Sequence, residues 1–269
     1  MREGLAPIGG TMRSRIDGIW PILSILTLTA CTTLPATQPL SPSARDQIAS
    51  SEVVVPIRQS EIYVFVPDSQ LAAAAGGGLL WALIDTGVNS VRTSKAEAAV
   101  RPLRDQVVDF DFDGMMRDDL KNALSQLSWL HLDTVKVSKN TTPQSADQEL
   151  VSASDEAILV TSVDYQLSND ATMLTVSLNA ALYPNSERLR ALRPGKGSTP
   201  SALENALYRN NFSVQRGAPN STDDRDLNIA QWSADHGAAL RSALTSSAAD
   251  LAKRLETDLD GHAGTTALK

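Results

Sequence analysis

Three aspartates at alternate positions form the pattern in this sequence that is most similar to a known metal-binding motif. Asp109, Asp111 and Asp113 match the first, third and fifth positions of a calcium-binding loop, in which alternate carboxylates converge on one ion. Gly114 matches the sixth position of that loop. The twelfth position is Leu120, although such a loop requires a bidentate glutamate there. The three aspartates are therefore only a weak candidate for a metal site.

The same stretch also fits a purely structural interpretation. Phe110 and Phe112 alternate with the aspartates, as in a short strand with one face buried and one in water. Asp113 would then lie near the start of a helix, where its carboxylate can accept main-chain N–H bonds. That helix is expected to end near Leu127, because apolar residues recur on one helical face at Met116, Leu120, Ala123, Leu124 and Leu127.

Other groups that could catalyse a reaction are sparse. His131, His236 and His262 lack the spacing of zinc ligands, and the sequence contains no Gly-x-Ser-x-Gly motif. Lys196 lies between glycines, but Gly197 stands where a phosphate loop requires serine or threonine. We therefore predict a protein that is not an enzyme, with no catalytic residues and an unknown binding site.

The only cysteine, Cys31, closes an apolar run of about a dozen residues that begins at Ile19. Arginines precede this run, and small residues lead into the cysteine. A basic start, a short apolar core and a small-residue cleavage point are the layout of a secretory signal peptide. The run is too short for a membrane-spanning helix, which needs about 20 apolar residues. A single cysteine also rules out an internal disulfide.

The segment Leu28-Thr29-Ala30-Cys31 resembles the lipobox of bacterial lipoproteins. The resemblance implies cleavage after Ala30, a diacylglyceryl group on the sulfur of Cys31 and acylation of the new amino terminus. This covalent lipid is the only non-protein group expected. By resemblance to enterobacterial sorting, Thr32 predicts the periplasmic face of the outer membrane, with the inner membrane as the alternative. Met12 is an alternative start, because a compact basic region follows it.

The chain without its leader is acidic and poor in aromatic residues. Residues 1–30 carry three arginines and two carboxylates, so removing them changes the formal net charge from −7 to −8. An acidic balance argues against nucleic acid and against electrostatic binding to anionic lipid. No second cysteine exists, so stability must come from burial of Leu, Val, Ile and Ala.

Composition divides the chain into four parts. Residues 1–30 are the expected signal peptide. Residues 31–50 are rich in Thr, Ser and Pro without apolar periodicity, which predicts a flexible tether. Residues 51–262 are expected to form a single folded domain, and residues 263–269 a disordered tail.

Strands are predicted where apolar and polar residues alternate. The clearest pair is 159–167 and 174–182, separated by a short polar turn, which predicts a β-hairpin with one buried face. Further strands are expected at 53–57, 62–66, 129–139 and 207–214. The segment 184–204, between the predicted strands 174–182 and 207–214, carries Arg188, Arg190, Arg193 and Lys196. These basic residues suit an exposed loop or the binding of an acidic partner.

A long helix is predicted from about Asp226 to Asp260, with Gly261 as its stop. A second helix is predicted at residues 79–91, directly after a Gly/Ala-rich stretch, because its apolar residues recur at helical spacing. Pro102 is expected to break or kink the C-terminal end of this helical region. Together these elements predict an α+β fold, with an antiparallel sheet of about four to six strands and helices on one face.

Three functions remain open. The favoured one is a membrane-anchored, non-catalytic binding or accessory factor in cell-envelope assembly or transport, because the order of elements resembles small periplasmic accessory lipoproteins. The first alternative is an oligomeric lipoprotein whose Gly/Ala-rich segment 72–84 inserts into the membrane, since Ala74, Gly78 and Ala82 would permit close helix packing. The second is a cell-wall hydrolase that uses carboxylates such as Asp109 and Asp111.

Overall fold

The computed structural model describes residues 37–56, 62–64, 94–95, 97–138, 154–192 and 206–261. All of these residues belong to one unit of the chain, Pro35–Lys269. Cys31, the segment 72–84 and the tail 263–269 lie outside the described residues. What the sequence predicts for them stays a prediction.

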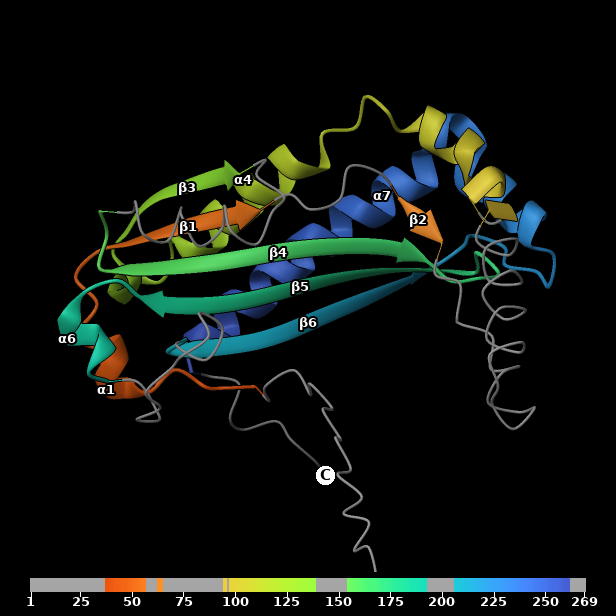
Figure 1. Ribbon diagram of the computed structural model, residues 1–269. Coiled ribbons are helices and arrows are strands. Elements are labelled where there is room, and N and C mark those ends of the chain that lie inside the picture. The colour runs from red at the N-terminus through yellow and green to blue at the C-terminus, as the bar shows by residue number, and fades with distance from the viewer. Residues whose placement is uncertain are drawn as a thin grey trace, which may run out of the picture. The chain divides into compact units, whose positions relative to one another are not determined.

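A mixed sheet forms the centre of the domain, and its long axis runs along the strands (Figure 1). The strand order is β3-β1-β4-β5-β6, and β2 pairs with β4. The strands are β1 (Ser51–Pro56), β2 (Tyr63–Val64), β3 (Leu132–Ser138), β4 (Ala157–Leu167), β5 (Met173–Pro184) and β6 (Tyr208–Gly217). Strands β4, β5 and β6 are antiparallel, whereas β1 pairs in parallel with both β3 and β4. The sheet is therefore mixed and not wholly antiparallel as predicted, because β1 and β3 are joined to their neighbours by long connections and not by hairpins.

The predicted hairpin is confirmed as β4 and β5. Leu159 pairs with Leu182, and Leu167 pairs with Leu174. These residues are fully buried, whereas Asn179 on the opposite face of β5 is exposed. A shift of the β4–β5 pairing by one residue would expose these leucines to solvent, so the alternation of residue types determines the register.

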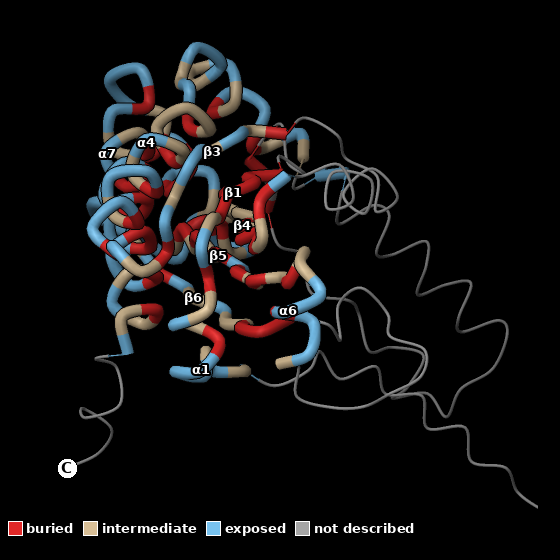
Figure 2. The backbone as a smooth tube through the Cα atoms, turned by 90° about the vertical axis from the view of Figure 1, so that its left-hand side faces the viewer, coloured by how far each residue is buried: buried red, intermediate tan, exposed pale blue. Residues whose placement is uncertain are grey.

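Two helices cover the buried face of the sheet, α4 (Phe112–Leu124) and α7 (Arg225–Leu259). Both lie on the same side of the strands (Figure 2). Fully or almost fully buried residues of α7 contribute to the core at Leu240, Leu244, Ala248, Leu251, Leu255 and Leu259. The α+β class, the helices on one face and the long C-terminal helix are therefore confirmed. Residues 97–106 are also helical, and this helix continues through Pro102.

The long helix α7 contains one break that the spacing did not predict. Asp235, His236 and Gly237 have positive φ angles of 50°, 57° and 73°. A Cβ atom on Gly237 would lie 2.9 Å from Cγ1 of Val107. Glycine is required at this point by both the backbone angle and the close approach of the turn that follows residues 97–106.

The strand predicted around Phe110 and Phe112 is wrong. Residues 107–110 form a turn, and Phe112 is the first residue of α4. The helix is capped by Asp111 rather than Asp113, since Oδ1 of Asp111 accepts the N–H of Gly114 at 2.9 Å. The N-terminal N–H groups of a helix lack partners, and this carboxylate supplies one. The ring of Phe112 packs edge-on against Tyr165, with centroids 5.0 Å apart.

Residues 37–50 belong to the folded domain rather than to a flexible tether. They include the short helix α1 (Pro42–Arg45), which begins at the N-cap Ser41. Ala44 and Ile48 are buried in the core. Composition predicted a tether because few of these residues are apolar. The burial of Ala44 and Ile48, together with the main-chain bonds of Gln38, holds the segment on the domain.

Several main-chain groups on the outer edge of β6 have hydrogen-bond partners within the domain. Gln38 pairs with Arg209 through two main-chain bonds of 2.8 and 2.9 Å. The main-chain N–H and C=O groups of Arg209 point away from β5. In an antiparallel strand the direction alternates, so the main-chain groups of Asn211 and Ser213 also point away from β5. The carbonyl of Ser213 accepts Nη1 of Arg254 at 3.0 Å, and the N–H of Asn211 bonds to the side chain of Asn210. An open edge would invite another strand, and these bonds oppose that.

Candidate functional site

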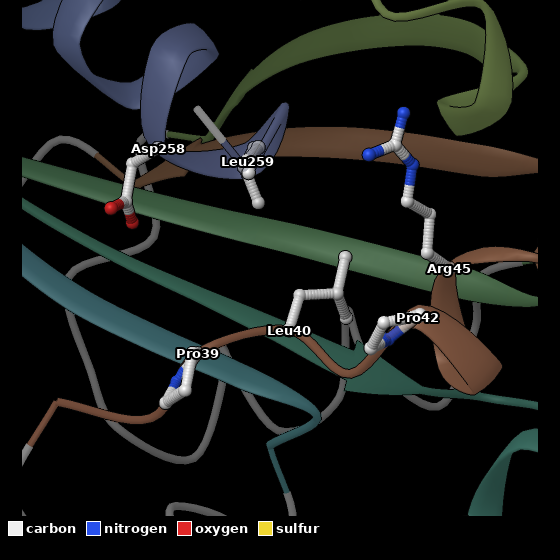
Figure 3. Close-up of a pocket in the computed structure, with 7 residues that line it drawn as sticks. Pro39, Leu40, Pro42, Arg45, Asp258 and Leu259 are labelled. Atoms are coloured by element: carbon white, nitrogen blue, oxygen red, sulfur yellow. The ribbon is translucent and has the colours of Figure 1, made fainter. Parts of the chain in front are cut away.

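A groove of about 460 Å³ separates the N-terminal segment from the end of α7. Figure 3 shows Pro39, Leu40 and Pro42 on one side of it, opposite Leu259 and Asp258. The proline and leucine side chains give the groove apolar walls, while Arg45 and Asp258 give it two charged groups. A site of this composition suits the binding of a partly apolar segment.

Arg45 joins the two walls of this groove. Its Nη1 donates to the main-chain carbonyl of Asp260 at 3.1 Å, and its Nη2 lies 3.3 Å from Oδ1 of the same residue. The last carbonyls of a helix lack intrahelical partners and carry partial negative charge, so a guanidinium is favoured there. The guanidinium also lies over the ring of Trp129, 5.0 Å from its centroid.

Gln38 attaches the beginning of the same segment to the sheet. Besides its two main-chain bonds to Arg209, its side-chain Nε2 donates to the carbonyl of Ala206 at 2.7 Å. The segment is thus held at both ends, by Gln38 at the sheet edge and by Arg45 at the helix terminus. This arrangement gives the groove a defined shape.

The carboxylate of Asp258 is already bound. The hydroxyl of Tyr208 donates to its Oδ2 at 2.7 Å, and Nδ2 of Asn210 donates to the same oxygen at 2.9 Å. Burial, followed by the bond to Asp258, raises the pKa of Tyr208 above its usual range. The phenol stays protonated, and Oδ2 of Asp258 is held by two donors of the domain itself.

The candidate metal site of the sequence does not assemble. Oδ1 of Asp109 accepts Nη2 of Arg241, and this hydrogen bond is the main cause of its lowered pKa. Arg241 also donates to the carbonyls of Gln106 and His236, so it ties the turn after residues 97–106 to the break in α7. Asp111 is engaged as the cap of α4. Within the described ranges, no group of three or more His, Cys, Asp or Glu could hold a metal ion.

The buried charge at Glu52 was not predicted from the sequence. This residue is 3% exposed in β1, and its Oε2 accepts Nζ of Lys136 in β3. The hydrogen bond to Glu52 raises the pKa of Lys136. An acidic residue at the head of the apolar run Val53–Val55 was the available signal, since a buried carboxylate requires a partner. Arg45 and Gln38 were missed as well, and no local pattern links them to residues far along the chain.

The helices of the described part of the chain are either too short or too polar to cross a membrane. Cys31 lies outside that part, so its lipid attachment stays a prediction. The same holds for the Gly/Ala-rich segment 72–84 and for Arg193 and Lys196.

No protein-family model matches the chain, and no curated protein matches it. Two solved structures of the PelC dodecamer from Paraburkholderia phytofirmans, one with a point substitution, are similar at 11% and 10% sequence identity. Each comparison covers 82% of this chain and 94% of the PelC chain, with a TM-score of 0.30. At these values the likeness assigns neither a family nor a function to the chain.

Proposed function

We propose that the protein is a lipid-anchored lipoprotein of the periplasmic face of the outer membrane. In this proposal it acts as a non-catalytic binding or accessory factor in cell-envelope assembly or transport. The lipobox-like residues Leu28 to Cys31 support the anchor, and the groove between Leu40 and Leu259 supports a binding role.

One observation carries the proposal: the first residue that the structure describes, Thr37, lies only six positions after Cys31, and the segment that begins there packs on the domain. Gln38 and Arg45 hold this segment, and the segment forms one wall of the groove. A partner in the groove would therefore be engaged close to the anchored residue. A binding site that is restricted to the membrane layer meets other membrane proteins at a higher effective concentration than a freely diffusing site would.

The positions of Asp109 and Asp111 bear on the carboxylate-based hydrolase alternative. A hydrolase that used Asp109 and Asp111 would need both carboxylates in one concave site. Asp109 instead pairs with Arg241, and Asp111 caps α4.

The experiment is photo-crosslinking in cells from a photoreactive residue at Leu40 in the groove. We expect a discrete crosslink to an envelope protein, and we expect a Cys31→Ser variant to lose both this crosslink and its membrane association. A photoreactive residue at Asn169, in the β4–β5 turn, is the matched control. Equal crosslinking from both positions, or quantitative membrane association of Cys31→Ser, would contradict the proposal.

A further inference from the structure

The C-terminal end of α7 carries a carboxylate that no basic residue of the described chain neutralises. Oε2 of Glu256 lies 2.6 Å from Nζ of Lys253, and Oδ1 of the C-cap Asp260 lies 3.3 Å from Nη2 of Arg45. Asp258 stands between these two carboxylates in the chain, and no ion pair of the described residues includes it. The carboxyl end of a helix also carries partial negative charge, so a cation beside Asp258 would be favoured.

The carboxylate of Asp258 is fixed in place with one oxygen still able to accept. Its Oδ2 accepts both the hydroxyl of Tyr208 at 2.7 Å and Nδ2 of Asn210 at 2.9 Å. Both donors are neutral, so they leave the negative charge of the carboxylate in place. Within the described residues, Oδ1 accepts no hydrogen bond. A cation that binds Oδ1 therefore meets a side chain that is already ordered, which lowers the entropic cost of binding.

The groove combines this carboxylate with an apolar surface. Figure 3 shows the carboxylate of Asp258 well away from the guanidinium of Arg45, with Leu40 and Leu259 between them in the view. Arg45 is already engaged by Asp260 and lies over the ring of a tryptophan. The charge of Asp258 is therefore the one in the groove that a partner can neutralise.

We propose that the groove binds a polypeptide segment in which an arginine or lysine stands next to a leucine, isoleucine, valine or proline. The basic side chain pairs with Oδ1 of Asp258, and the apolar side chain packs between Leu40 and Leu259. This inference rests on the proposed function, because it requires a partner in the groove. It goes further in naming the chemistry of that partner.

The lining of the groove favours a peptide over other classes of ligand. Among the described lining residues only Arg45 and Asp258 have polar side chains, and the others are Pro, Leu and Gly. A sugar chain would need several hydroxyl or amide partners along its length, whereas aliphatic side chains suit this surface. An anionic lipid headgroup or an acidic segment would be repelled by Asp258.

The test selects a partner without assuming its sequence. A phage-displayed library of random short peptides is panned against the full chain in detergent, and an enriched peptide is then titrated by fluorescence anisotropy. We expect the enriched peptides to share a basic residue next to an apolar one. Binding to the parent should weaken between about 0.05 and about 0.5 M salt, because an ion pair at a partly exposed site is screened.

Asp258→Asn removes the charge and keeps an oxygen that can accept from Tyr208 and Asn210. We expect it to weaken the binding of an enriched peptide by at least about tenfold, because a charged hydrogen bond is lost. Asp250→Asn is the matched control on the same helix, where the carboxylate pairs with Arg216, and it should bind as the parent does. Replacing the basic residue of the peptide by glutamine should weaken binding to the parent but cause no further loss with Asp258→Asn.

The possible failures are distinguishable. If enriched peptides lack a basic residue, or bind Asp258→Asn as tightly as the parent, the inference is overturned. The photo-crosslink from position 40 in cells decides the proposed function separately, since it requires a partner in the groove but no particular charge. Absence of any peptide that depends on Asp258 or is lost in Leu40→Ala would also overturn the inference.

Two other occupants of the groove would give different results. Self-association of the parent that Asp258→Asn abolishes would assign the groove to a second copy of the chain. Peptide binding that strengthens several-fold when residues 262–269 are removed would assign the groove to that segment of the chain itself. Either result would overturn the inference of a basic and apolar partner segment.

Discussion

Arg45 binds Asp260 although the two residues are 215 positions apart in the chain. Nη1 of Arg45 donates to the main-chain carbonyl of Asp260 at 3.1 Å, and Nη2 contacts its carboxylate at 3.3 Å. The N-terminal segment is thereby attached to the residue that caps α7, and it also meets Trp129 through the same guanidinium. This single contact helps to determine the shape of the groove.

Removing this contact should loosen the N-terminal segment. We expect Arg45→Ala to lower the free energy of unfolding by about 1–2 kcal/mol, because a partly exposed charge pair and a bond to a helix terminus are lost. Urea denaturation in a Cys31→Ser background measures this change. Arg117→Ala is the matched control, since Arg117 pairs with its exposed chain neighbour Asp118. A loss as large in the control would contradict the role of Arg45.

The pair Asp109–Arg241 should make stability depend on acidity. The hydrogen bond from Arg241 lowers the pKa of Asp109 in the folded state below its usual 3.8. The stabilisation is therefore complete above pH 3.8 and is lost as the pH falls through the lower folded-state value. We expect Asp109→Asn to melt at a lower temperature than the parent at about pH 6, and the difference to shrink toward about pH 3. A constant difference across that range would contradict this assignment.

Calcium should leave the protein unchanged. Asp111→Ala is expected to cost about 1 kcal/mol, because Asp111 caps α4 through Gly114. The melting temperature of the parent should stay the same with millimolar calcium or with a chelator, since Asp109 and Asp111 are engaged elsewhere. Differential scanning calorimetry of the parent and of Asp111→Ala measures both effects. A calcium-dependent rise that disappears in Asp111→Ala would restore the metal site.

The outer edge of β6 should resist pairing with a second copy of the protein only while its main-chain groups keep their hydrogen-bond partners within the domain. In Arg254→Ala the carbonyl of Ser213 loses its 3.0 Å partner, which leaves part of the strand edge unpaired. We expect stronger concentration-dependent association in sedimentation velocity, with stability reduced by about 1 kcal/mol. Lys253→Ala is the control, because Lys253 is bonded to Glu256 within its own helix. Equal behaviour of the two variants would show that the cap is unimportant.

Local periodicity was enough to predict the elements whose residues repeat. Alternation over 159–167 and 174–182 predicted β4 and β5, and the spacing of leucines from 240 to 259 predicted α7. The signal is reliable because a buried face requires apolar residues at the period of the element. The same reasoning was wrong at Phe110 and Phe112, where two alternating residues are too few to separate a strand from a helix start.

The parallel pairing of β1 with β3 and β4 had no counterpart in the sequence signals. Val53 lies beside both Val135 and Leu159, which are distant in the chain. A run of β-branched residues predicts a strand but does not name its neighbour. The break in α7 at Asp235 to Gly237 was not predicted either, because apolar residues at helical spacing lie on both sides of it.

The sequence by itself determined the candidate anchor, the fold class and the faces of the regular elements, because each depends on residue types at short spacing. The tertiary structure decided the rest. It alone shows that Ser41 and Pro42 begin a helix held against the domain, that Arg45 reaches Asp260, and that Asp109 and Asp111 have other partners. Contacts between residues far apart in the chain depend on how helices and sheet pack, and no local pattern records that packing.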